Sequence, residues 1–275
     1  MKTGTIELKS RFPFLGEDGK NPTLTYYLPY NMTEMGWQDK KRPCILICPG
    51  GGYAGCSQRE DEPIGVHFLP LGFNVFVLRY SVAPHRFPSQ LREVAAAYEI
   101  IKENADQWNC DTEKMGIMGF SAGGHLAAHY SNAWDIPEVR EVFSDSYRPF
   151  ASVLCYPVIT AEPNIRHTGS FVNLLGHEPD ADEIGRFSCE KLVRDDTPPA
   201  FLWHTAADNC VPVQSTLLYA NALANHKIPH EVHIYPYGWH GLSTADEHTN
   251  KDVNADMTYV QSWLDSLKNW VKLTF

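Results

Sequence analysis

The feature that most constrains this fold is the stretch around Ser121, where an apolar segment ends abruptly. Residues 114–120 are typical of a buried strand and residues 122–133 of a helix, so Ser121 lies at their junction. Gly119 and Gly123 flank it in the pattern Gly-x-Ser-x-Gly. A tight strand-to-helix turn leaves little space for a Cβ atom on either side of the serine. We therefore expect a sharp turn that presents the Ser121 hydroxyl at the end of a strand.

Strand-like and helix-like segments alternate along most of the chain. The predicted strands are residues 3–9, 23–28, 43–48, 73–80, 114–120, 150–156, 199–205 and 230–235. The predicted helices are residues 90–107, 122–133 and 213–226, with a closing amphipathic helix near the C-terminus. We expect the first two strands to be an antiparallel pair joined by a turn region at residues 16–22. The remainder predicts βαβ units, and therefore an α/β fold with a mainly parallel, doubly wound sheet and helices on both faces.

The length of 275 residues fits one large α/β domain. Residues 159–196 interrupt the alternation with prolines, glycines, charges and short apolar clusters. This composition predicts an insertion of loops and short helices over the sheet. Residues 31–42 are polar and predict a surface connection.

The formal net charge of -10 argues against a nucleic-acid partner, because phosphates would be repelled. No apolar run reaches the length of a membrane span, and the first residues lack the apolar core of a signal peptide. The seven cysteines are an odd number, and several lie inside apolar strands, which favours free buried thiols. From these features we expect a cytoplasmic protein with no membrane partner. Nothing in the sequence decides whether it is a monomer or a homo-oligomer.

A serine hydroxyl becomes a nucleophile when a histidine takes its proton and a carboxylate orients that histidine. Asp208 follows the strand at 199–205, and His240 follows the strand at 230–235 in a glycine-flanked loop. Loops at the carboxyl ends of parallel strands converge, so we expect both side chains near Ser121. The alternative candidates are Asp246 and Asp256 for the acid, and His204 and His248 for the base.

Pro49-Gly50-Gly51-Gly52-Tyr53 follows the predicted central strand. Consecutive glycines allow backbone N–H groups to approach a substrate oxygen, as stabilisation of a tetrahedral oxyanion requires. We predict Gly51, Gly52 and Ala122 as the donors, with Ala122 at a helix N-terminus. The alternatives are a flexible turn and a phosphate-binding loop, but the stretch lacks the lysine and Ser/Thr of a P-loop.

Together these motifs resemble a known family, the small serine esterases of the α/β-hydrolase fold. The resemblance covers residues 43–240 and is closest to bacterial feruloyl and acetyl-xylan esterases and to hormone-sensitive-lipase-like carboxylesterases. It also rests on residues 79–84, Asp208-x-x-Val211-Pro212 and Gly238-x-His240-Gly241. It implies that Ser121, Asp208 and His240 form the catalytic triad. Pro49 stands where lipase-like members carry histidine, which favours the carbohydrate-esterase branch.

The expected activity is hydrolysis of small, short-acyl esters through an acyl-enzyme, without a cofactor. An acetylated oligosaccharide is the substrate class that the resemblance favours. Tyr53 and Trp239 are candidates for the substrate pocket, and residues 79–84 could line that pocket or anchor a loop. The alternatives are a peptidase of the same fold, for which the chain has no room for the usual extra domain, and a non-catalytic binding protein on a hydrolase scaffold.

Two further patterns predict no additional site. Glycoside hydrolysis would need two carboxylates that flank the scissile bond. Glu60, Asp61 and Glu62 are adjacent in sequence and point in different directions, so we interpret them as a solvated loop. His125 and His129 have the spacing of two zinc ligands on a helix, but the glutamate of the His-Glu-x-x-His motif is missing. We therefore expect no metal, with one of these histidines packed near the serine turn.

Overall fold

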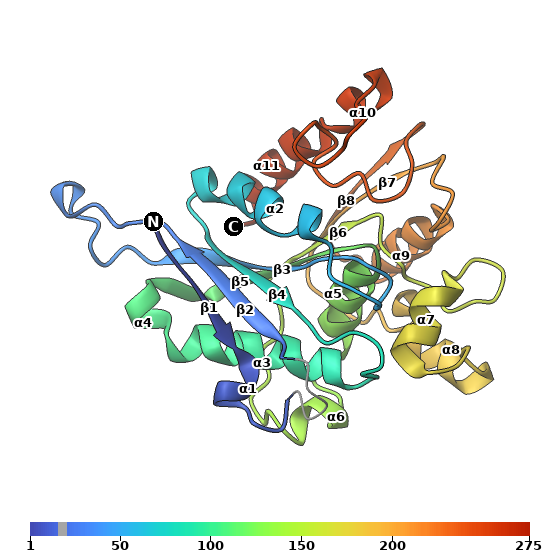
Figure 1. Cartoon of the computed structure of the whole chain (residues 1–275), viewed down its shortest axis with the longest axis horizontal. Coiled ribbons are helices and arrows are strands. Elements are labelled where there is room, and N and C mark those ends of the chain that lie inside the picture. The colour runs from blue at the N-terminus through green and yellow to red at the C-terminus, as the bar shows by residue number, and fades with distance from the viewer. Residues whose placement is uncertain (16–20) are drawn as a thin grey trace.

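The computed structural model describes residues 1–15 and 21–275 and contains an eight-stranded sheet with the order β1-β2-β4-β3-β5-β6-β7-β8 (Figure 1). The strands are β1 (Lys2–Glu7), β2 (Thr23–Leu28), β3 (Arg42–Cys48), β4 (Asn74–Arg79), β5 (Cys110–Phe120), β6 (Ser152–Cys155), β7 (Ala200–Thr205) and β8 (His230–Tyr235). β1 pairs antiparallel with β2, and β2 pairs antiparallel with β4. The pairs from β4 through β3 to β8 are all parallel. The predicted fold class is confirmed.

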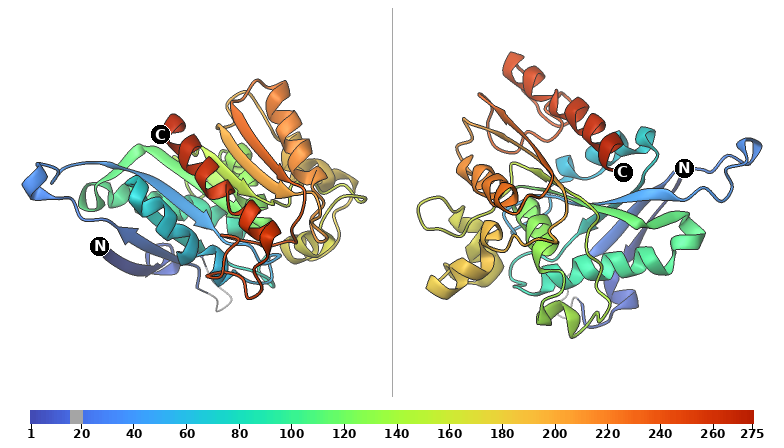
Figure 2. Two further views of the ribbon diagram at one scale, coloured as in Figure 1. Left: turned by 90° about the horizontal axis from the view of Figure 1, so that it is seen from above. Right: turned by 180° about the vertical axis from the view of Figure 1, so that it is seen from behind.

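Helices cover both faces of this sheet (Figures 1 and 2). They are α1 (Leu8–Arg11), α2 (Glu62–Phe68), α3 (Ser89–Glu103), α4 (Ala105–Trp108), α5 (Ser121–Ala133), α6 (Pro137–Arg140), α7 (Thr168–Leu175), α8 (Ala181–Phe187), α9 (Gln214–Asn225), α10 (Ala255–Val260) and α11 (Trp263–Thr274). Single 3-10 turns are η1 (Thr33–Met35), η2 (Gln58–Glu60), η3 (Leu69–Leu71) and η4 (Cys189–Lys191). In the described residues, no helix is both long and apolar enough to cross a membrane.

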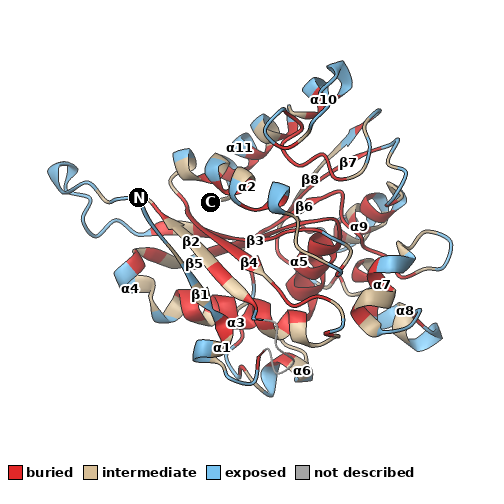
Figure 3. Cartoon of the chain, viewed as in Figure 1, coloured by how far each residue is buried: buried red, intermediate tan, exposed pale blue. Residues whose placement is uncertain are grey.

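The buried apolar side chains form two layers, one on each side of the sheet. One layer joins the sheet to α3, α5 and α9, and the other joins it to α2, α10 and α11. The central strands are buried along most of their length (Figure 3). Strands covered on both faces read as continuous apolar runs, which explains why β3 and β4 were recognisable from the sequence.

The connections place two loops side by side at the centre of the sheet. The chain runs from β3 to β4 on one side and then returns to form β5 on the other side of β3. Parallel pairing of Cys48 with Gly119 brings the carboxyl ends of β3 and β5 together. Ligand sites of open α/β sheets lie at such a reversal of strand order. The glycine-rich loop after β3 and Ser121 after β5 both lie there.

The main differences from the sequence expectations concern short helices. The predicted closing helix is divided into α10 and α11. The apolar spacing continues across the break between them, so periodicity alone does not reveal the break. α2 was not predicted, since seven residues that include Pro63 and Gly65 carry little periodic signal. Between β6 and β7, residues 159–196 contain α7, α8 and η4. Part of the predicted turn region at residues 16–22 lies outside the described residues.

Candidate active site

Ser121 occupies a strained turn between β5 and α5. Its backbone φ is 52°, a left-handed value that side chains rarely adopt. A Cβ atom at Gly119 would lie 2.0 Å from the Gly123 carbonyl oxygen, and one at Gly123 would lie 2.1 Å from the Cys48 carbonyl oxygen. Both glycines are therefore required by close backbone packing. The turn leaves Ser121 8% exposed at the carboxyl end of β5.

Ser121 is hydrogen-bonded to a histidine from the loop after β8. The distance from Ser121 Oγ to His240 Nε2 is 2.7 Å, and His240 Nδ1 lies 2.7 Å from Asp208 Oδ2. Because Nδ1–H donates a hydrogen bond to the carboxylate, Nε2 of the neutral ring carries no proton and can accept the serine proton. The structure thus brings together three of the residues that the sequence predicted as a site.

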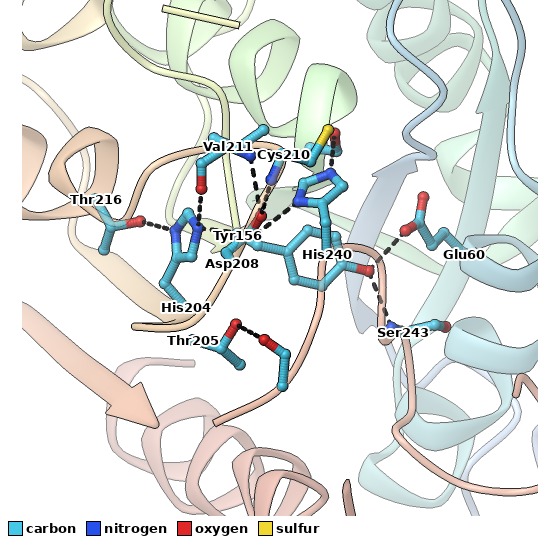
Figure 4. Close-up of polar contacts among 12 residues, drawn as sticks. Glu60, Tyr156, His204, Thr205, Asp208, Cys210, Val211, Thr216, His240 and Ser243 are labelled. Carbon is cyan, nitrogen blue, oxygen red and sulfur yellow. Dashed lines mark hydrogen bonds and ion pairs between the residues drawn. The ribbon is translucent and has the colours of Figure 1, made fainter. Parts of the chain in front are cut away.

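Asp208 is saturated with hydrogen-bond donors. Its Oδ1 accepts from the backbone N–H groups of Cys210 and Val211, at 2.8 and 2.9 Å. Its Oδ2 accepts from His240 and also from His204 Nε2, at 3.1 Å (Figure 4). Burial raises the pKa of this carboxyl, but the hydrogen bonds from His204 and His240 outweigh burial and hold the pKa well below its usual range.

The alternative acids and bases occupy other positions. His204 is fully buried behind Asp208, where its Nδ1 lies 2.8 Å from Thr216 Oγ1, so it supports the acid and does not contact Ser121. Asp246 accepts hydrogen bonds from Thr244 and from the His248 backbone within its own loop. Asp256 is exposed in the first turn of α10.

Every carbonyl group of residues 49–53 accepts a hydrogen bond. The donors are Tyr80 Oη to Pro49, the Ser57 N–H to Gly50, the Ala54 and Gly55 N–H groups to Gly51, Asn173 Nδ2 to Gly52, and the Ala83 N–H to Tyr53. Gly51 and Gly52 have φ values of 134° and 61°, which favour glycine. These hydrogen bonds hold the loop in one conformation and satisfy its carbonyl groups. Residues 79–84 supply two of these donors, so this segment anchors the loop.

A cavity of about 210 Å³ opens beside Ser121. It is lined by Gly51, Gly52, Ser57, Arg59, Glu60, Ser121, His167, Cys210, His240 and Gly241. Most of these residues are glycines or carry polar or charged side chains, and one is a cysteine. The two predicted pocket aromatics are not among them: Tyr53 is 1% exposed and Trp239 is 41% exposed. The cavity therefore lacks the aromatic walls that the sequence suggested.

Comparison with known proteins identifies the family. The BD-FAE family model matches residues 32–223. This chain belongs to the BD-FAE family. This chain is 40% identical over 232 residues to endo-1,4-beta-xylanase B of Butyrivibrio fibrisolvens, and the match covers 80% of this chain and 36% of that protein. It is 31% identical over 263 residues to the acetylxylan esterase of Xylanibacter ruminicola, covering 94% of this chain and 49% of that protein. It spans half or less of these curated relatives.

A solved structure matches the BD-FAE chain along almost its whole length. The acetyl ester-xyloside bifunctional hydrolase from Caldicellulosiruptor lactoaceticus superposes with a TM-score of 0.84 and 35% identity, covering 98% of this chain and 95% of that one. The fold of the BD-FAE chain is the α/β-hydrolase fold, as the resemblance implied.

Glu60 is a site residue of the BD-FAE chain that the sequence interpretation missed. The prediction that residues 60–62 form a solvated loop is wrong for Glu60 and Asp61, which are 3% and 6% exposed. Glu60 Oε2 accepts from the Gly50 N–H at 2.7 Å, and Oε1 accepts from Tyr156 Oη at 2.6 Å. Burial raises the pKa of Glu60, although these two hydrogen bonds oppose it. An acidic run gives no sequence signal that its members are buried.

Tyr53 and His125 of α5 form a buried polar contact in the BD-FAE chain. Tyr53 Oη lies 2.9 Å from His125 Nδ1, and His125 Nε2 lies 2.9 Å from the Phe187 carbonyl oxygen. Burial lowers the pKa of His125 to about 4, so the ring stays neutral. Its Nδ1 therefore joins α5 to the glycine-rich loop after β3, and its Nε2 joins α5 to the last residue of α8. Among the described residues, no group of three or more His, Cys, Asp or Glu side chains could hold a metal ion.

Proposed function

We propose that this BD-FAE family member is a serine esterase that removes short acyl groups, chiefly acetyl, from hydroxylated substrates such as acetylated oligosaccharides. The observation that carries the proposal is the hydrogen-bonded series Ser121–His240–Asp208 beside the cavity. An acetylxylan esterase and an acetyl ester-xyloside hydrolase among its relatives support the acetyl group and the sugar.

Ser121 Oγ attacks the ester carbonyl carbon while its proton passes to His240 Nε2. The N–H groups of Gly51, Gly52 and Ala122 stabilise the negative charge on the carbonyl oxygen. The intermediate then collapses, and the alcohol leaves with the proton held by His240. Water attacks the acyl-serine, His240 takes a proton from it, and the carboxylic acid is released with Ser121 restored. Asp208 stabilises the imidazolium that forms in each half of the reaction.

The walls of the cavity support a short acyl group. A long acyl chain is held by apolar walls, because burying it there removes its surface from water. Among the residues that line the cavity beside Ser121, none is a Val, Leu, Ile, Met, Phe, Tyr or Trp. An acetyl group exposes a single methyl and needs little apolar surface, whereas the hydroxyl groups of a sugar can bind polar side chains of the lining such as Ser57, Arg59 and His167.

The test is hydrolysis of 4-nitrophenyl esters from acetate to decanoate by the wild type and by Ser121→Ala. We expect activity to be highest with acetate and to fall by about 10³-fold or more in the variant, because the nucleophile is lost. Labelling of the wild type by a fluorophosphonate, absent in Ser121→Ala, would show that this serine is the reactive one. Wild-type inactivity towards every ester would contradict the proposal.

A further inference from the structure

His167 contributes an imidazole to the cavity beside Ser121, and neither the sequence motifs nor the proposed chemistry assigns it a role. It lies between β6 and β7, directly before α7, for which it is the N-cap residue. It is half-buried, and it lines the same cavity as Ser121, Gly52 and His240. A side chain in this position can reach a bound ester.

The hydrogen bonds of the ring determine which nitrogen carries the proton. The Ser170 N–H donates to His167 Nδ1 at 3.3 Å, and Ser170 Oγ lies 2.8 Å from the same nitrogen. A backbone N–H is only a donor, so Nδ1 is an acceptor and bears no proton. The proton of the neutral ring is therefore on Nε2. Ser170 itself is 1% exposed, which fixes the partner in place.

The element that carries His167 is attached to the glycine-rich loop. Asn173, in α7, donates from Nδ2 to the Gly52 carbonyl oxygen at 2.8 Å, and the Phe87 N–H donates to the Leu174 carbonyl oxygen at 2.9 Å. His167 Cε1, which is bonded to Nε2, lies 3.9 Å from the position of a Cβ atom on Gly52. The ring is thus held against the loop that we assign to the oxyanion.

The surroundings of this ring disfavour its protonated form. Burial lowers the pKa of His167, the nearby His240 lowers it further, and Asp208 acts in the opposite direction. A neutral ring with an occupied Nδ1 has one N–H left to offer, and this group is a donor rather than a second base.

We propose that His167 Nε2–H is a specificity-determining donor that binds a hydroxyl or ether oxygen in the alcohol part of the substrate. An example is the hydroxyl group on the sugar carbon next to the acetylated one. This inference rests on the proposed ester hydrolysis. The acetyl group has one carbonyl oxygen, which the backbone donors of Gly51, Gly52 and Ala122 serve, and a methyl that accepts no hydrogen bond. The remaining acceptors belong to the alcohol part. Arg59 also lines this cavity, and its guanidinium is held by the Thr249 carbonyl and by Asn250.

Two amide variants separate the halves of the imidazole. In His167→Asn, the side-chain oxygen can accept from the Ser170 N–H, as asparagine commonly does at an N-cap, but no group reaches the place of Nε2. In His167→Gln, the longer side chain can place an amide N–H near Nε2. Each variant is assayed for kcat and KM with 4-nitrophenyl acetate, which has no sugar hydroxyls, and with acetylated xylo-oligosaccharides.

We expect His167→Asn to lose about tenfold in kcat/KM with the acetylated sugar and less than about twofold with 4-nitrophenyl acetate, as one neutral hydrogen bond would give. His167→Gln should keep most of the wild-type kcat/KM with the acetylated sugar. His167→Phe, which has a ring but no hydrogen-bond donor, should show the same substrate-selective loss as His167→Asn. Equal losses on both substrates, or no loss on either, would overturn the inference. Wild-type inactivity towards both esters would instead refute the proposed function.

Discussion

Two buried carboxylates, Asp208 and Glu60, differ in how they relate to His240. Asp208 bonds directly to His240 Nδ1, whereas Glu60 reaches the histidine through Tyr156, whose ring centroid lies 5.1 Å from that of His240 (Figure 4). Asp208 accepts hydrogen bonds from two backbone N–H groups and two histidines, and its pKa is lowered. Glu60 accepts one from Gly50 and one from Tyr156, and its pKa is raised.

The difference shows that burial alone does not determine what a carboxylate does. Burial raises the pKa of both groups, and the donors around each decide the final direction. A carboxylate held ionised beside an imidazole can stabilise a developing positive charge. Glu60 instead joins the glycine-rich loop at Gly50 to the loop after β8, because Tyr156 Oη also accepts from the Ser243 N–H at 3.0 Å. In the proposed mechanism, Asp208 serves the proton transfer, whereas Glu60 serves the geometry of the loops.

The largest difference between the two carboxylates should appear in Asp208→Asn. We expect kcat with 4-nitrophenyl acetate to fall by about 10³ to 10⁴-fold, because an amide cannot balance the imidazolium and selects the wrong histidine tautomer. The measurement is steady-state hydrolysis at neutral pH. Asp256→Asn is the matched control, since Asp256 is exposed and should keep wild-type activity. An active Asp208→Asn would remove this residue from the proposed triad.

A smaller effect is expected for Glu60→Gln. The amide oxygen can still accept from the Gly50 N–H, but the NH₂ group that replaces the second oxygen cannot accept from Tyr156 Oη, so the hydrogen bond that Tyr156 donates is lost. We expect kcat to fall by about tenfold with little change in KM, which is less than the 10²-fold or more from removal of an oxyanion donor. Glu62→Gln controls for the change of charge, because Glu62 is an exposed neighbour. A loss as large as that of Asp208→Asn would show that Glu60 takes part in proton transfer.

The sequence predicted the fold class because the central strands and the serine turn are encoded locally. The continuous apolar runs of β3 and β4 and the glycines on either side of Ser121 are requirements of backbone packing, which one short segment displays by itself. Asp208 and His240 were predicted from their places after successive strands, and their catalytic roles stay predictions. Glu60 is positioned by Tyr156, which lies 96 residues further along the chain. His167 is positioned by Ser170 in the helix that it precedes, and Asn173 of the same helix contacts Gly52, 121 residues earlier. No local pattern carries that information.

The smallest effect concerns stability in acid, where the two carboxylates should act in opposite directions. The lowered pKa of Asp208 gives a stabilisation that is complete above its ordinary value near 4 and is lost as pH falls through the folded value. The raised pKa of Glu60 gives a stabilisation that is complete below its ordinary value and is lost as pH rises through the folded value. Relative to the wild type, Asp208→Asn should therefore become less stable as pH rises from about 3 to 5, and Glu60→Gln should become more stable as pH rises above about 4. Urea unfolding of the three proteins across this pH range measures how the free energy of unfolding of each variant, relative to the wild type, changes with pH. If both variants changed in the same direction, the pKa values of the two carboxylates would not be shifted in opposite directions as their donors indicate.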